Sequence, residues 1–160
     1  MIDKIGNEEE MPILKYQELI DQIDLGEGIS CPPQNSIATD RDAYRYIFED
    51  DPNLESHKPA KVKSPKRILK AIEENCSLCG LSCFRSVDEA MSIYFNLVKA
   101  RPNLVKILGD SLAKGILNKK SGLLTENDEL GHFDLFEYST FDPYQTFMFF
   151  KKIELDNGNN

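Results

Sequence analysis

The chain has 160 residues, of which 41% are hydrophobic and 29% charged, as in an ordinary soluble globular domain. Its net charge of −8 disfavours nucleic acid and anionic lipid as partners, because both carry negative phosphates. No apolar run approaches the roughly 18–20 residues that cross a bilayer, and the first residues lack the features of a secretory signal. We therefore expect a cytoplasmic protein without a membrane segment, in which cysteines are free thiols or metal ligands rather than disulfides.

The first half of the chain predicts a helix, a loop and a strand. Residues 16–23 carry apolar side chains at i, i+3, i+4 and i+7, the spacing of a short amphipathic helix. Residues 30–42 contain Pro32-Pro33 and are expected to form a loop. Residues 43–50 alternate aromatic and β-branched side chains between two faces, which favours a strand.

Two further helices are marked by their start signals. Ser64 followed by Pro65 predicts the beginning of a helix over residues 64–75. Ser86 and Glu89 form a capping box, in which each side chain satisfies a backbone donor at the first turn of a helix over residues 86–101.

The remaining apolar segments are predicted to be strands. They cover residues 103–108, 133–138 and 146–155, and the last contains the unbroken run FMFF, which is typical of a central strand covered on both faces. Residues 119–132 are polar and are expected to form a long connection of the kind that often carries sites.

This order of elements predicts the α+β class, with a curved, mainly antiparallel sheet and about three helices packed on it. We expect a single globular domain over residues 11–155. The polar segments 1–10 and 156–160 are expected to be flexible termini.

The segment CSLCGLSCF contains three of the four cysteines. Cys76 and Cys79, followed by a glycine, match half of a zinc knuckle. Cys83 and Cys31 would complete the ligand set, and His57 and His132 are the other candidate ligands. The alternative is a group of free cysteines at a helix–strand junction. A redox pair is disfavoured, because Cys76 follows the predicted helix at the end that does not stabilise a thiolate.

His132 and a basic segment each have two interpretations, whereas His57 has one. His57 is expected to be solvated, whereas His132 is either a turn histidine or an acid–base group. No G-x-S-x-G motif is present, so the sequence predicts no Ser-His-Asp triad. The six basic residues within 57–70 indicate a solvated loop or a contact with phosphate or an acidic partner.

The order of three segments resembles the ADP-ribosyltransferase-like domains, which include small bacterial toxins that consume NAD. These are the strand bearing Arg45, the segment CGLSCFRSVDEAMSIYFNL and the segment GHFDLFEY. The resemblance implies that Arg45 meets the dinucleotide phosphates, Ser82 lies in the nicotinamide pocket and Tyr94 stacks on nicotinamide. It also implies that Glu129 or Glu137 is the acidic residue and that these side chains converge on one cleft.

A non-enzymatic role is the competing and favoured hypothesis, because no catalytic constellation is evident. Under this hypothesis the protein binds a protein partner in a regulatory, immunity or antitoxin-like role. Aromatic residues between acidic ones would be the anchors, namely Phe136, Tyr138, Phe141 and Tyr144. The NAD-binding transferase is the first alternative, and a small zinc-stabilised module is the second.

Overall fold

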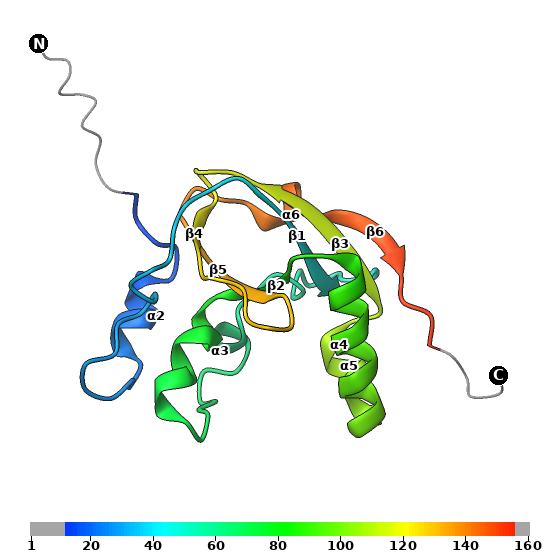
Figure 1. Cartoon of the computed structure of the whole chain (residues 1–160), viewed down its shortest axis with the longest axis horizontal. Helices are drawn as coiled ribbons and strands as arrows, with labels where there is room; N and C mark the ends of the chain where they lie inside the picture. The colour runs from blue at the N-terminus through cyan, green and yellow to red at the C-terminus, as the bar shows by residue number, and fades with distance from the viewer. Residues whose placement is uncertain (1–11, 156–160) are drawn as a thin grey trace, which may run out of the picture.

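The computed structural model describes residues 12–155 and contains a six-stranded sheet with the strand order β4-β5-β2-β1-β3-β6 (Figure 1). All the pairings between these strands are antiparallel. The predicted α+β class is therefore confirmed. Residue 11 and the flexible termini predicted for 1–10 and 156–160 lie outside the described residues.

The six strands are β1 (Arg41–Ile47), β2 (Leu81–Phe84), β3 (Ser111–Leu117), β4 (Gly122–Leu124), β5 (His132–Glu137) and β6 (Met148–Lys152). Seven residue pairs join β1 to β3 and four join β2 to β5. A single pair, Tyr44 with Phe84, joins β1 to β2. The sheet is therefore weakly connected at its middle.

The helical segments are α2 (Gln17–Gln22), α3 (Ala60–Lys63), the 3₁₀ helix η1 (Ile72–Cys79), α4 (Val87–Ala100), the 3₁₀ helix η2 (Pro102–Leu104), α5 (Val105–Leu108) and α6 (Pro143–Thr146). In Figure 1, α2, α3 and α4 lie along one side of the arched sheet. The helix α4 begins where predicted, since Ser86 Oγ accepts the Glu89 N–H at 3.2 Å. The Glu89 carboxylate accepts the Ser86 hydroxyl at 2.9 Å rather than a backbone N–H, so only half of the predicted capping box forms.

Three apolar clusters hold these elements together. One lies within the sheet and includes Ala43, Leu135 and Phe147. A second joins α2 and η1 to β5 around Phe136. The third packs α4 against β1, β2 and β3 around Tyr94, so the amphipathic face of α4 is buried against the β1-β2-β3 side of the sheet.

The strand predicted over residues 103–108 is wrong, because this segment forms η2 and α5. Pro102 supplies the first residue of the 3₁₀ turn and has the fixed φ that suits a helix start. Gly109 then adopts a φ of +134°, a backbone conformation that favours glycine, and the chain turns into β3, which the sequence did not predict.

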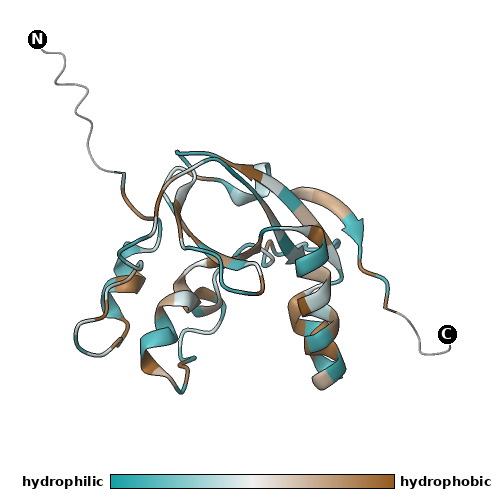
Figure 2. Ribbon diagram, viewed as in Figure 1, coloured by the Kyte–Doolittle hydropathy of each residue, from teal (hydrophilic) through white to brown (hydrophobic). Residues whose placement is uncertain are grey.

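The segment FMFF was predicted to be a central strand, and this is also wrong. β6 is the terminal strand of the sheet and pairs only with β3. Its Met148, Phe149 and Phe150 are 62%, 51% and 44% exposed, whereas Phe147 just before the strand is buried. Figure 2 shows β6 in brown tones up to its teal lysines. Hydrophobicity alone does not tell which residues of such a run face a core.

Two other predictions also change. The helix expected to begin at Ser64 and run over residues 64–75 is wrong, because residues 64–71 form turns and irregular structure between α3 and η1, and Ser64 is the C-cap of α3. The long connection expected over residues 119–132 contains the short strand β4.

Candidate ligand-binding cleft

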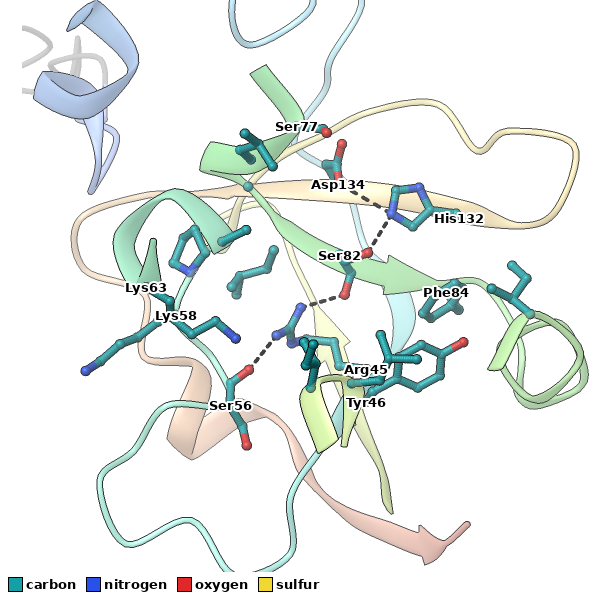
Figure 3. Close-up of a pocket in the computed structure, with 18 of the residues that line it drawn as sticks. Arg45, Tyr46, Ser56, Lys58, Lys63, Ser77, Ser82, Phe84, His132 and Asp134 are labelled. Atoms are coloured by element: carbon teal, nitrogen blue, oxygen red, sulfur yellow. Dashed lines mark hydrogen bonds and ion pairs between the residues drawn. The ribbon is translucent and has the colours of Figure 1, made fainter. Parts of the chain in front are cut away.

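A cleft of about 440 Å³ opens where β1 and β2 separate. It is lined by Arg45 of β1, Ser82 of β2, and His132 and Asp134 of β5 (Figure 3). The side chain of Arg45 bridges the gap, because its Nη1 donates to the Ser82 carbonyl at 2.5 Å. A side-chain donor thus satisfies a carbonyl of β2 beside the gap.

Arg45 is buried, with 6% of its surface exposed. Besides the Ser82 carbonyl, it donates from Nε to His57 Nδ1 at 3.0 Å and from Nη2 to the Ser56 carbonyl at 2.7 Å. Within residues 12–155 no carboxylate lies within ion-pair distance of this guanidinium. Burial lowers the pKa of Arg45, but a guanidinium stays protonated in proteins.

The side chains that touch Arg45 are uncharged, and the carboxyl groups of Glu137 and Asp134 act on its charge only from beyond ion-pair distance. Burial, followed by the charge of Arg45, lowers the pKa of His57 to about 3, so this histidine is neutral and accepts the Arg45 Nε–H. Burial raises the pKa of the Cys83 thiol to about 12, so that thiol is neutral as well. The positive charge of Arg45 is therefore not balanced by the side chains that touch it.

The ends of the cleft differ in character. Three basic side chains line the cleft, namely Lys58, Lys63 and Arg67, and Figure 3 shows Lys58 and Lys63 on the side away from Phe84. Tyr46 and Phe84 lie together on the other side in Figure 3, and the lining contains the further apolar side chains Ile93, Leu97, Ile107, Leu108 and Leu130. The arrangement suits a ligand with a negatively charged group and an apolar or aromatic group.

A hydroxyl–imidazole pair lies between the two ends. Ser82 Oγ is 2.6 Å from His132 Nε2, and the Asp134 carboxylate lies 3.5 Å from the same nitrogen (Figure 3). The carboxylate of Asp128 is 3.8 Å from His132 Nδ1. Burial, with a smaller effect of Asp128, raises the pKa of Asp134 to about 7, and burial lowers the pKa of His132.

The structure brings together only part of the predicted NAD site. Arg45 and Ser82 meet in the cleft, as the resemblance implies. Tyr94 is buried in the α4 cluster, where its hydroxyl donates to the Gly109 carbonyl at 2.6 Å. Glu129 is exposed in a turn outside the cleft lining, and Glu137 is buried in an ion pair with Lys15 at 2.7 Å.

Two aspartates, and no glutamate, line the cleft within the described residues. Asp134 and His132 alternate with core residues along β5 and face the cleft, and Asp128 precedes them in a turn. The i, i+2 spacing of His132 and Asp134 was a signal in the sequence. Their approach to Ser82 depends on the β2–β5 register, which pairs Ser82 with Asp134 and Phe84 with His132.

The aromatic residues proposed as partner anchors have structural roles. Phe136 is 1% exposed and belongs to the cluster with Cys79, so its role as an exposed anchor is wrong. Tyr138 and Phe141 are partly buried against apolar clusters. The Tyr144 hydroxyl donates to the Leu54 carbonyl and accepts the His57 N–H.

The cysteines do not form the predicted zinc set. Cys31 and Cys76 form a disulfide with a Cα–Cα separation of 5.6 Å, which corrects the expectation of four free or metal-binding thiols. The loop after α2 returns to η1, where Asn75 Nδ2 donates to the Asp24 carbonyl. Cys79 and Cys83 are free and buried in different clusters, and no group of three metal-binding side chains occurs in residues 12–155.

No family model, no curated protein and no solved structure matches this chain. Among residues 12–155, none of the helices has the length and apolar character needed to cross a bilayer.

Proposed function

We propose that the cleft between β1 and β2 binds a phosphate-bearing nucleotide, with NAD as the first candidate. The observation that carries this proposal is the buried Arg45 guanidinium, which faces a cleft and has no carboxylate partner within residues 12–155. A buried charge without a counter-charge is costly. A ligand anion would supply the missing charge and form charge-assisted hydrogen bonds.

Two features of the cleft favour a nucleotide over a simple anion. Lys58, Lys63 and Arg67 extend the positive region, which suits more than one phosphate. The apolar end, with Tyr46 and Phe84, offers a wall against which a base or nicotinamide ring can pack. These features agree with the resemblance to NAD-consuming ADP-ribosyltransferase-like domains, which implies that Arg45 and Ser82 of this chain lie in one dinucleotide site.

Thermal unfolding with and without NAD tests the proposal. A ligand with a Kd of about 100 μM, added at about 1 mM, stabilises the folded state by about 1.4 kcal/mol. For a chain of this size that raises the Tm by roughly 3–6 °C. ADP-ribose and pyrophosphate should also stabilise the protein, whereas nicotinamide alone should have a smaller effect.

Arg41→Lys is the matched control for Arg45→Lys, because both arginines belong to β1. Arg41 stacks on the Phe133 ring at 4.0 Å and donates to Asn127, and it does not line the cleft. The rise in Tm caused by NAD should persist in Arg41→Lys and disappear in Arg45→Lys, because lysine lacks the planar guanidinium that binds phosphate. An unchanged Tm of the wild-type protein with NAD would contradict the proposal. Equal rises in Tm with NAD in the two variants would also contradict it.

A second candidate function is the binding of a protein partner in a regulatory role. It is favoured by the β6 patch, which consists of the exposed Met148, Phe149 and Phe150 on the terminal strand. Exposed apolar edge strands are sites where another chain can dock. A partner that co-purifies with the wild type should be lost from Phe149→Ser/Phe150→Ser and retained by Ile68→Ser, whose side chain is also exposed. Equal recovery from all three proteins would refute this role for β6.

A further inference from the structure

We propose that Ser82 is a nucleophile, that His132 accepts its proton, and that the pair acts on esters or thioesters that carry an anionic group. The inference goes beyond nucleotide binding. It rests on the proposed anion site only for the choice of substrate, because the nucleophile itself is defined by Ser82, His132 and Asp128.

The geometry of the pair is that of a serine and its general base. Ser82 is exposed to the cleft, and its Oγ lies within hydrogen-bond distance of His132 Nε2 at 2.6 Å. Such contact between a hydroxyl and an imidazole is the first geometric requirement for an activated serine. Ser82 lies on β2 and His132 on the adjacent β5, so two paired strands hold both side chains.

A tight turn fixes the orientation of His132. One carboxylate oxygen of Asp128 accepts the backbone N–H groups of Leu130 and His132, each at 2.9 Å. The other oxygen lies 3.8 Å from His132 Nδ1. A carboxylate on that side favours the tautomer with the proton on Nδ1 and leaves Nε2 free to accept the Ser82 proton. Asp128 is therefore a positioning residue.

Gly131 allows this turn to form. Its φ is +86°, and a Cβ atom at this position would lie 2.4 Å from the Glu89 carboxylate. Glu89 is itself held by Arg85 and by Ser86 at the start of α4. The helix start and the turn thus pack against each other and set the position of the imidazole.

The charge next to Ser82 also favours the reaction. The Arg45 guanidinium lies against the Ser82 carbonyl at 2.5 Å and is otherwise bonded to neutral groups. A fixed positive charge in a buried site stabilises negative charge that develops nearby. The same guanidinium, with the basic end of the cleft, would hold an anionic group of the substrate.

The proposed step is acyl transfer to the enzyme. Ser82 Oγ forms a bond to the carbonyl carbon of the ester or thioester, and its proton passes to His132 Nε2. The bond from that carbon to the leaving oxygen or sulfur then breaks, and the leaving group takes the proton from His132. In the second half a water oxygen forms a bond to the acyl carbon and passes a proton to His132 Nε2. The bond from that carbon to Ser82 Oγ then breaks, Ser82 takes the proton from His132, and the carboxylic acid leaves.

A fluorophosphonate probe tests the nucleophile directly. Ser82 Oγ would attack phosphorus and displace fluoride, which leaves a covalent adduct that mass spectrometry locates. We expect one adduct, on Ser82, that is absent from Ser82→Ala. Ser77→Ala is the matched control, because Ser77 also lines the cleft and is exposed but donates to the Glu74 carbonyl. Absence of labelling, or labelling that persists in Ser82→Ala, would overturn the inference.

His132→Gln should slow labelling by about 100-fold or more, the lower range of general-base effects. Equal rates in a folded His132→Gln variant would show that the histidine does not act as the base. Urea unfolding of each variant verifies that it is folded.

Asp128→Asn tests the positioning role through the pH dependence of labelling. The charged or titratable groups that face His132 are Asp128 and Asp134, with Arg45 behind Ser82. Burial lowers the pKa of His132 and the charge of Asp128 opposes that shift, so neutralisation of Asp128 should move the pH of half-maximal labelling downward. An unchanged pH profile would restrict Asp128 to a purely structural role in the turn.

Two ester substrates distinguish acyl transfer by Ser82 from nucleotide binding in the same cleft. p-Nitrophenyl acetate is neutral, and mono-p-nitrophenyl succinate carries a carboxylate. The wild type should hydrolyse the succinate faster, and Arg45→Lys should lose that preference. Labelling of Ser82 without any NAD effect would support the nucleophile and contradict NAD as the ligand. A rise in Tm with NAD but no labelling of Ser82 would support NAD as the ligand and contradict the nucleophile.

Discussion

The disulfide between Cys31 and Cys76 should contribute measurably to stability. It closes a segment with a sequence separation of 45 residues and ties the loop after α2 to η1. The chain-entropy relation for a loop of this length gives a loss of about 13 cal/mol/K in the unfolded chain, which is about 4 kcal/mol at 25 °C. We expect the oxidised protein to exceed the variant Cys31→Ala/Cys76→Ala in free energy of unfolding by up to that amount.

Equilibrium unfolding in urea measures the difference. Reductant should lower the midpoint of the wild type and leave the double variant unchanged. Unreduced, denatured wild type should show two reactive thiols, those of Cys79 and Cys83. Four reactive thiols in that sample, or equal midpoints for oxidised wild type and variant, would refute the reasoning. The thiol count also bears on location, because disulfides persist mainly in oxidising compartments.

Three further predictions concern unfolding free energies measured in urea. Tyr94→Phe should lose about 1–2 kcal/mol, because the Gly109 carbonyl loses the hydroxyl at 2.6 Å; an unchanged value would contradict this. Gly109→Ala should lose about 2 kcal/mol or more, since its Cβ would lie 2.5 Å from the Ile47 carbonyl oxygen at a φ of +134°. Gly28→Ala, also at positive φ but in open space, should lose less. Asp134→Asn should be more stable than wild type above pH 7 and equal to it near pH 4.

The sign of the Asp134 effect follows from its raised pKa of about 7 in the folded protein against 3.8 in the unfolded chain. Between these values the unfolded chain releases the proton and the folded protein retains it, so stability falls as pH rises through this window. The difference between these two pKa values corresponds to at most about 4 kcal/mol in the free energy of unfolding. Wild type and Asp134→Asn with parallel pH profiles would show that this carboxyl is not perturbed.

Local patterns predicted those elements whose signals are complete within a few residues. The capping box of Ser86 and Glu89 located the start of α4, and the alternation over residues 43–50 indicated β1. β3 was missed because it contains Lys114 and Gly115, which weaken a strand pattern. Gly115 occurs there because the Phe147 ring packs on it, and a Cβ would lie 2.7 Å from that ring. Only the folded chain shows that contact.

The site was less predictable than the fold, because its members come from distant segments. Arg45 and Ser82 were chosen through a resemblance, and the structure brings them within hydrogen-bond distance. The Ser82–His132 pair was not predicted, since the residues are 50 positions apart and no local motif links them. The register of β2 with β5 decides their contact. The disulfide was missed for the same reason, because Cys31 reaches Cys76 only after the intervening chain has folded back.

Because β1 and β2 pair incompletely, Arg45 both completes the hydrogen bonding of β2 and lines the cleft. A full ladder would place backbone groups where Arg45 now reaches the Ser82 carbonyl, and it would close the cleft. Because of the gap, the Ser82 carbonyl accepts its hydrogen bond from the Arg45 guanidinium, and the charge of that guanidinium is buried as a result. Loss of Arg45 would therefore remove a structural hydrogen bond as well as an anion-binding group. A smaller rise in Tm with NAD in Arg45→Lys is therefore assigned to the anion site only where that variant is as stable as Arg41→Lys.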